Sequence, residues 1–125
     1  MSALVVVLLV VAGGLGAVAR YVVDGAVRSR SAVAFPLGTV VVNLTGSFVL
    51  GLLTGLAMAQ LLPDPVRLVA GTGFLGGYTT FSTATFETVR LVQERRVAAA
   101  LLNGLGTLLA TTAVAGLGLV IGLAA

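Results

Sequence analysis

Long apolar stretches separated by short polar connectors constrain this chain more than any other feature. Of its 125 residues, 58% are hydrophobic and 9% are charged, whereas a soluble domain usually carries about a quarter charged residues. About 20 apolar residues are enough for a helix to cross a bilayer. We therefore expect an all-α integral membrane protein in which residues 1–125 form a single membrane domain.

The pattern predicts four transmembrane helices joined by short connectors. Their approximate bounds are 3–23, 35–60, 65–92 and 97–124. No Lys or Arg precedes the first apolar run, and the run is longer than the apolar core of a signal peptide. We expect the first run to be a retained span and not a cleaved signal.

The third predicted span contains poor helix formers in its middle. It includes the stretch Gly73-Phe-Leu-Gly-Gly-Tyr-Thr-Thr-Phe-Ser-Thr-Ala-Thr-Phe-Glu87, and glycine and threonine disfavour a helix interior. Counted from Pro65, Gly76 lies about 16 Å along a helix, roughly halfway through the hydrocarbon. We predict a helix break at Gly76–Thr80 near the bilayer midplane, where freed backbone groups can bind ions. The alternative is that the glycines only allow close helix packing.

Small and polar residues recur every four positions on the second span. They are Thr39, Asn43, Ser47, Gly51 and Gly55. Because this spacing places them on one helix face, the two glycines are predicted to contact a neighbouring helix closely. A buried Asn43 must find hydrogen-bond partners, and two interpretations stay open. It links two helices, or its amide donates to a permeating anion.

Polar residues on the other spans have more than one interpretation as well. Asn103 and Gly118-xxx-Gly122 on the fourth span favour helix packing. Arg20, near the end of the first span, either extends to the lipid headgroups or raises the anion concentration at a pore mouth. Glu87 is predicted to face a vestibule and not the bilayer centre.

The residue types present argue against catalysis. The chain has no Cys and no His, and it shows no paired carboxylates and no phosphate-binding loop, so we do not expect an enzyme. A net charge of +3 without a basic cluster gives no support for a nucleic-acid partner. Carbonyl oxygens at the break suit a small cation, and the positive edge of the Phe81 ring suits an anion. An ion conduit fits these groups best.

Three motifs follow one another along the chain. They are Gly13-Gly-x-Gly-Ala-x-x-Arg-Tyr21, Pro36-x-Gly-Thr-x-x-Val-Asn-x-x-Gly-Ser-Phe48 and Gly73-Phe-x-Gly-Gly-Tyr-Thr-Thr-Phe-Ser-Thr83. With them the chain resembles, over essentially its whole length, the small bacterial fluoride channels called CrcB or Fluc. The resemblance implies a fluoride-selective channel of the bacterial inner membrane that exports fluoride passively and so reduces cytoplasmic fluoride.

The resemblance also implies an antiparallel dimer with two fluoride pores and a structural sodium ion at the subunit interface. Residues that match the family's ion pathway are Asn43, Phe81, Ser82, Thr83 and Arg20. The carbonyl oxygens of Gly76 and Thr79 match those that hold the sodium ion. The family pattern commonly has a second phenylalanine three residues after the first, where this chain has Ala84.

Arginine residues are distributed unevenly over the predicted connectors. Only Arg67 lies near the second connector, whereas the others lie near the first and third. Short-loop arginines favour the cytoplasm, so we expect one main orientation with both termini extracytoplasmic. An antiparallel dimer then requires a paralogous subunit of opposite orientation.

Two alternative functions remain open. In the first, the chain is a non-conducting or half-active subunit of a heterodimeric fluoride channel. The second, less favoured, is a small proton-coupled multidrug-type exporter. That mechanism needs an ionisable group within the membrane, and the predicted first span has no carboxylate.

Overall fold

A computed structural model describes residues 1–125, and every regular element in it is a helix. In chain order the elements are α1 (Ala3–Arg30), α2 (Leu37–Met58), α3 (Asp64–Arg67), η1 (Leu68–Leu75), α4 (Gly76–Tyr78), α5 (Ser82–Gln93), α6 (Val97–Leu101), η2 (Leu102–Gly106) and α7 (Thr107–Ala124). The two η elements are π-helical turns within longer helices. The all-α prediction is confirmed.

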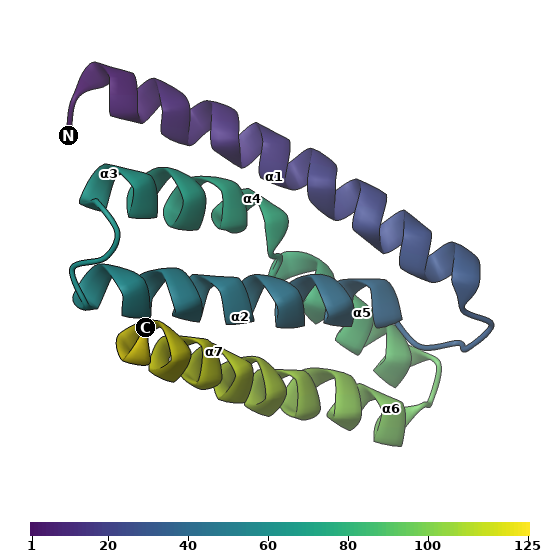
Figure 1. Cartoon of the computed structure of the whole chain (residues 1–125). Coiled ribbons are helices and arrows are strands. Elements are labelled where there is room, and N and C mark those ends of the chain that lie inside the picture. Colours follow the sequence, from purple (N-terminus) through teal and green to yellow (C-terminus); the bar gives the residue numbers. More distant parts are fainter.

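Three helices are long and apolar enough to cross a membrane. They are α1, α2 and the continuous helix Val97–Ala124 made of α6, η2 and α7. The segment between α2 and α6 is divided into two parts and provides no fourth helix of that length. Figure 1 shows that α1, α3–α4, α2 and α7 run side by side and that both termini lie at the same end of the molecule.

Helix α1 is longer than the first predicted span. It continues past Val23 to Arg30, through most of the predicted connector. Asp24 and Arg28 form an ion pair at 2.8 Å with the i,i+4 spacing that stabilises helices. The charged side chains therefore extend the helix, and the connector to α2 is shortened to residues 31–36.

The chain leaves helical geometry between α4 and α5, later than the predicted Gly76–Thr80. Gly76 is helical, with φ −61° and ψ −38°, whereas Thr79 is extended, with φ −78° and ψ 157°. Gly77 also stays in the helix, where a Cβ would collide with the Gly13 carbonyl group on α1. Gly77 therefore serves close packing, whereas a Cβ at Gly76 would have no neighbour within 4 Å, and the prediction that the break begins at Gly76 was wrong.

Helices α2 and α7 form the largest interface in the molecule. A Cβ added to any of four glycines there would collide with a backbone carbonyl oxygen of the facing helix. We call these residues the glycine seam: Gly51 and Gly55 on α2, Gly118 and Gly122 on α7. The absence of side chains lets the two backbones touch. The packing predicted for these glycines is confirmed.

Few residues are enclosed by the single chain. Only 18 of the 125 residues are buried, and large apolar side chains cover much of the outside. A small core of Val42, Leu75 and Tyr78 joins α2 to η1 and α4. An apolar outer surface of this extent suits a lipid environment and contacts between subunits.

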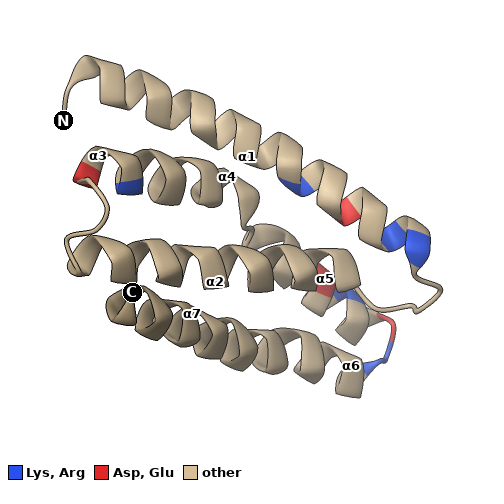
Figure 2. Cartoon of the chain, viewed as in Figure 1, with Lys and Arg blue, Asp and Glu red and all other residues tan.

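Charged residues gather toward one end of the molecule. Figure 2 shows them on the second half of α1, on α5 and on the connector to α6, with α3 carrying the charges of the opposite end. The termini lie at the end that carries α3 (Figure 1). The uneven arginine distribution noted in the sequence therefore corresponds to two ends of the folded chain.

Candidate functional site

Asn43 joins the middle of α2 to the break between α4 and α5. Its Nδ2 donates to the Thr80 carbonyl oxygen at 2.9 Å, and its Oδ1 accepts from the Thr80 amide at 2.9 Å. These two bonds satisfy backbone groups that lack helical partners. Asn43 is 9% exposed, and Nδ2 makes no other hydrogen bond within the chain. Asn43 thus links two segments and still has one N–H to donate.

Hydroxyl groups add hydrogen bonds to the backbone around the break. The Thr79 hydroxyl donates to the Leu75 carbonyl oxygen at 2.8 Å, and the Thr80 hydroxyl accepts from the Thr83 amide at 3.2 Å. The Ser82 hydroxyl lies 3.4 Å from that of Thr80. Such local bonds stabilise the backbone where the chain leaves one helix and enters the next.

A cavity of about 290 Å³ lies beside the break. Thirteen residues from α2, the break, α5, η2 and α7 line it, and none of them is charged. Its hydrogen-bonding residues are Asn43, Ser47, Thr79, Thr80, Thr85, Thr88, Asn103, Thr107 and Thr111. We call it the neutral cavity. Its lining offers an ion many neutral dipoles and no full charge.

Phe81 lines the neutral cavity at the start of α5 and is 85% exposed in the single chain. Ala84, which the resemblance predicts to stand in place of a second phenylalanine, lines the same cavity. The fold therefore brings Asn43 and Phe81 together, with Ala84 beside them. Ser82, another residue of the predicted pathway, is not part of this lining.

A second, smaller cavity of about 90 Å³ lies on the other side of the break. It is lined by Arg20, Asp24, Thr39, Val42, Thr80 and Thr83, and we call it the inner cavity. The Nε atom of Arg20 is buried there without a hydrogen-bond partner, the only such side-chain atom in the structure. Since Thr80 lines both cavities, the break separates Arg20 and Thr83 from Asn43 and Phe81.

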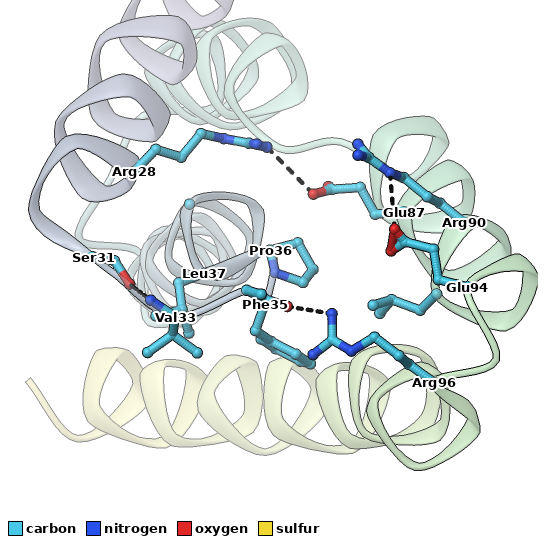
Figure 3. Close-up of a pocket in the computed structure, with 13 residues that line it drawn as sticks. Arg28, Ser31, Val33, Phe35, Pro36, Leu37, Glu87, Arg90, Glu94 and Arg96 are labelled. Atoms are coloured by element: carbon cyan, nitrogen blue, oxygen red, sulfur yellow. Dashed lines mark hydrogen bonds and ion pairs between the residues drawn. The ribbon is translucent and has the colours of Figure 1, made fainter.

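A wider vestibule of about 340 Å³ opens at the charged end of the molecule. Its charged lining residues are Arg28, Glu87, Arg90, Glu94 and Arg96 (Figure 3). Glu94 lies 3.7 Å from Arg90, and Arg96 donates a hydrogen bond to the Ala34 carbonyl oxygen. Glu87 accepts from Arg28 at 3.3 Å and from the Thr39 hydroxyl at 2.5 Å. Glu87 therefore lines this vestibule and is held there from two other helices.

The carbonyl oxygens of Gly76 and Thr79 are the predicted cation ligands. Neither accepts any of the backbone hydrogen bonds found outside the regular helices. Gly76 is exposed, and the space where a side chain would stand is open. No cluster of carboxylates could hold a metal ion instead. Carbonyl oxygens of this kind are hard donors, which small hard cations prefer.

Sequence reasoning did not identify the role of Thr80 or the contact between Thr39 and Glu87. The four-residue spacing of Thr39 and Asn43 was a usable signal, since both face the divided segment. Asn103 was assigned to helix packing. It does link helices, donating to the Thr88 hydroxyl at 2.8 Å, but it also lines the neutral cavity.

The chain matches known proteins over nearly its whole length. The family described as "CrcB-like protein, Camphor Resistance (CrcB)" matches residues 7–119. "Fluoride-specific ion channel FluC 1" of Leifsonia xyli subsp. xyli is 58% identical over 98% of this chain and 89% of that protein. "Fluoride-specific ion channel FluC 2" of Cutibacterium acnes is 48% identical over 89% of this chain and 91% of that protein. This chain therefore belongs to the CrcB-like protein family.

Proposed function

We propose that this chain is a fluoride-selective channel, and not an enzyme, that lets fluoride leave the bacterial cytoplasm passively. Relatives that align with almost all of it are named fluoride-specific ion channels. The observation that carries the proposal is the neutral cavity beside the break. Neutral donors replace the hydration shell of a small anion without trapping it as a full positive charge would.

Five side chains carry out the steps in this proposal. Arg20 attracts the anion to the inner cavity, and Thr83 offers it a hydroxyl there. On the other side of the break, Asn43 donates its remaining N–H, and Phe81 presents the positive edge of its ring. Ser82 supports the passage next to Thr80. The membrane potential drives the ion outward, by about 2.3 kcal/mol per 100 mV.

The proposal places residues 1–125 in the inner membrane as one multi-pass domain. Helices α1, α2 and α6–α7 each cross it, and the divided segment α3–α5 crosses as a fourth span whose break lies near the midplane. Supporting this, the segment carries a charged pair near each end, Asp64 with Arg67 and Arg90 with Glu94. Charges near both ends suit a segment that reaches both surfaces.

A structural sodium ion is part of the proposal. The Gly76 and Thr79 carbonyl oxygens of two subunits would hold it on the two-fold axis between them. Their lack of partners among the non-helical hydrogen bonds and the open space at Gly76 support this assignment. When bound, the ion supplies positive charge that ties the two breaks together.

We further propose that the channel is an antiparallel dimer and that its second subunit is a paralogous chain of opposite orientation. The arginine bias between the two ends supports a single orientation with extracytoplasmic termini. Ala84 in the neutral cavity supports a partner that contributes an aromatic ring. Numbered relatives, named FluC 1, FluC 2 and FluC 3, show that such names occur in series. In this arrangement the chain alone is a non-conducting or half-active subunit.

Fluoride efflux from liposomes, recorded with a fluoride electrode, tests the function. Liposomes that contain this chain together with a paralogous chain are expected to release fluoride rapidly and chloride not at all. Chloride release as fast as fluoride release would contradict fluoride selectivity. No fluoride release, from these liposomes or from liposomes that contain this chain alone, would contradict the channel function.

Liposomes that contain this chain alone separate the two assemblies. Little efflux supports the heterodimer, and rapid efflux supports a homodimer. Reporter fusions at the C-terminus give an independent measurement, because one-way insertion produces only an external signal. Comparable signals from both sides would show dual orientation.

A further inference from the structure

Four polar side chains form a row between the vestibule and the inner cavity. The Asp24 carboxylate accepts from Arg28 Nε at 2.8 Å, and Arg28 Nη2 donates to Glu87 Oε2 at 3.3 Å. The other Glu87 oxygen accepts from the Thr39 hydroxyl at 2.5 Å. Arg28 and Glu87 line the vestibule, whereas Asp24 and Thr39 line the inner cavity. The row is therefore the partition between the two cavities.

The negative charge of Glu87 would repel an anion that passes along this row. Its side chain is only 13% exposed, so water screens its charge poorly. An unneutralised carboxylate about 5 Å from a passing anion lowers the anion's occupancy by roughly tenfold at an effective dielectric constant between protein and water. Figure 3 shows the Arg28 side chain extending across the vestibule to the Glu87 carboxylate. Arg28 thus supplies the opposite charge.

We propose that Arg28 is a positioning residue of the anion route. Its ion pair with Glu87 neutralises and holds the carboxylate at the partition, and this allows an anion to pass from the vestibule to the inner cavity. Asp24 orients the Arg28 guanidinium through Nε, and Thr39 holds the second carboxylate oxygen. This inference rests on the proposed function, because it assumes that anions use these cavities.

Arg28→Gln tests the proposal, with Arg30→Gln as the matched control. Arg30 lies on the same helix, is exposed like Arg28, and the substitution removes the same charge, but Arg30 forms no ion pair. Arg28→Gln is expected to lower fluoride efflux by about tenfold at sub-saturating fluoride. Arg30→Gln is expected to lower it by less than about twofold, because Arg30 neutralises no carboxylate and its own charge is screened by water and salt.

A second substitution separates neutralisation of Glu87 from a purely structural role. Adding Glu87→Gln to Arg28→Gln is expected to restore efflux to within about twofold of that of the unsubstituted channel, since the row then loses one positive and one negative charge and keeps Asp24. If Arg28→Gln slows efflux equally with and without the carboxylate, or no more than Arg30→Gln does, the proposal is wrong.

A thiol probe reads the same charge without relying on fluoride transport. The chain has no cysteine, so Thr83→Cys places a single thiol in the inner cavity. The ratio of its modification rates by iodoacetate and iodoacetamide, an anion and a neutral molecule of similar size, reports the local potential. Arg28→Gln is expected to lower this ratio about tenfold, and adding Glu87→Gln to restore it.

The two readouts distinguish the failure of this inference from failure of the proposed function. If the unsubstituted channel shows no fluoride efflux, the proposed function is wrong. The ratio of thiol modification rates still tests the role of Arg28 in that case. An unchanged thiol ratio in Arg28→Gln overturns the inference even where fluoride efflux is rapid.

Discussion

The two halves of helix α2 carry the same four-residue spacing but build opposite surfaces. In the second half, Gly51 and Gly55 remove all space between α2 and α7. In the first half, Thr39, Asn43 and Ser47 line the inner and neutral cavities. The four-residue spacing places residues on one helix face. Their type decides whether that face packs directly on a neighbouring helix, as with glycine, or lines a cavity with polar groups, as with threonine, asparagine and serine.

The strongest way to break this comparison is to add a side chain to the glycine seam. Gly118→Leu is expected to prevent folding, because even a Cβ there would meet the Phe48 carbonyl oxygen, and overpacking by far less costs about 1–3 kcal/mol. Gly116→Leu on the same helix is the control, since its position has no neighbour within 4 Å. Size-exclusion chromatography and thermal unfolding in detergent measure the difference. Equal behaviour of the two variants would contradict the packing role of the seam.

In the other half of α2, Asn43→Ala is expected to abolish fluoride flux while the protein still folds and dimerises. The substitution removes two hydrogen bonds to Thr80, and leaving a buried backbone group unpaired costs about 1–3 kcal/mol. We therefore expect a lower but cooperative unfolding transition together with lost efflux. Asn103→Ala, which removes a bond to Thr88, controls for the loss of a buried amide in the unfolding measurement. Wild-type flux in Asn43→Ala would remove this residue from the pathway.

Phe81→Ala sharpens the comparison by separating flux from stability. We expect abolished efflux, and a change in unfolding free energy within about 0.5 kcal/mol, because the ring is 85% exposed in the single chain. Phe86→Ala serves as control, since that ring is also exposed, at 69%, but does not line the neutral cavity. Equal efflux losses in both variants would show that the exposed rings act through assembly and not through the pathway.

Replacing sodium with a bulky organic cation is expected to weaken the dimer while each subunit stays folded. Loss of the ion should weaken the dimer by about 1.4–2.7 kcal/mol if sodium normally exceeds its dissociation constant by about ten to a hundred times. Dimer content against sodium concentration, followed by chromatography in detergent, measures this. The glycine seam needs no ion, so helix content is expected to stay constant. A dimer indifferent to sodium would falsify the assignment of the Gly76 and Thr79 carbonyl groups.

Tertiary structure decided where the divided segment leaves the helix. Intrinsic propensity pointed to Gly76 and Gly77 as the first broken residues, yet both stay helical. Close contact with the α1 backbone at Gly77 holds them there, because packing overrides weak helix propensity. At Thr80, in contrast, Asn43 from α2 supplies the backbone partners that the helix would have provided.

By itself, the sequence determined the properties that depend on residue types and their spacing within a single helix. Apolar length predicted the helices that can cross a membrane, and glycine spacing predicted the seam, because a helix places every fourth residue on one face. Only the tertiary structure paired Arg28 with Glu87, 59 residues away, and divided the hydroxyl residues between two cavities. The physical reason is that hydrogen bonds and ion pairs depend on ångström-scale distances between elements, which local periodicity does not specify.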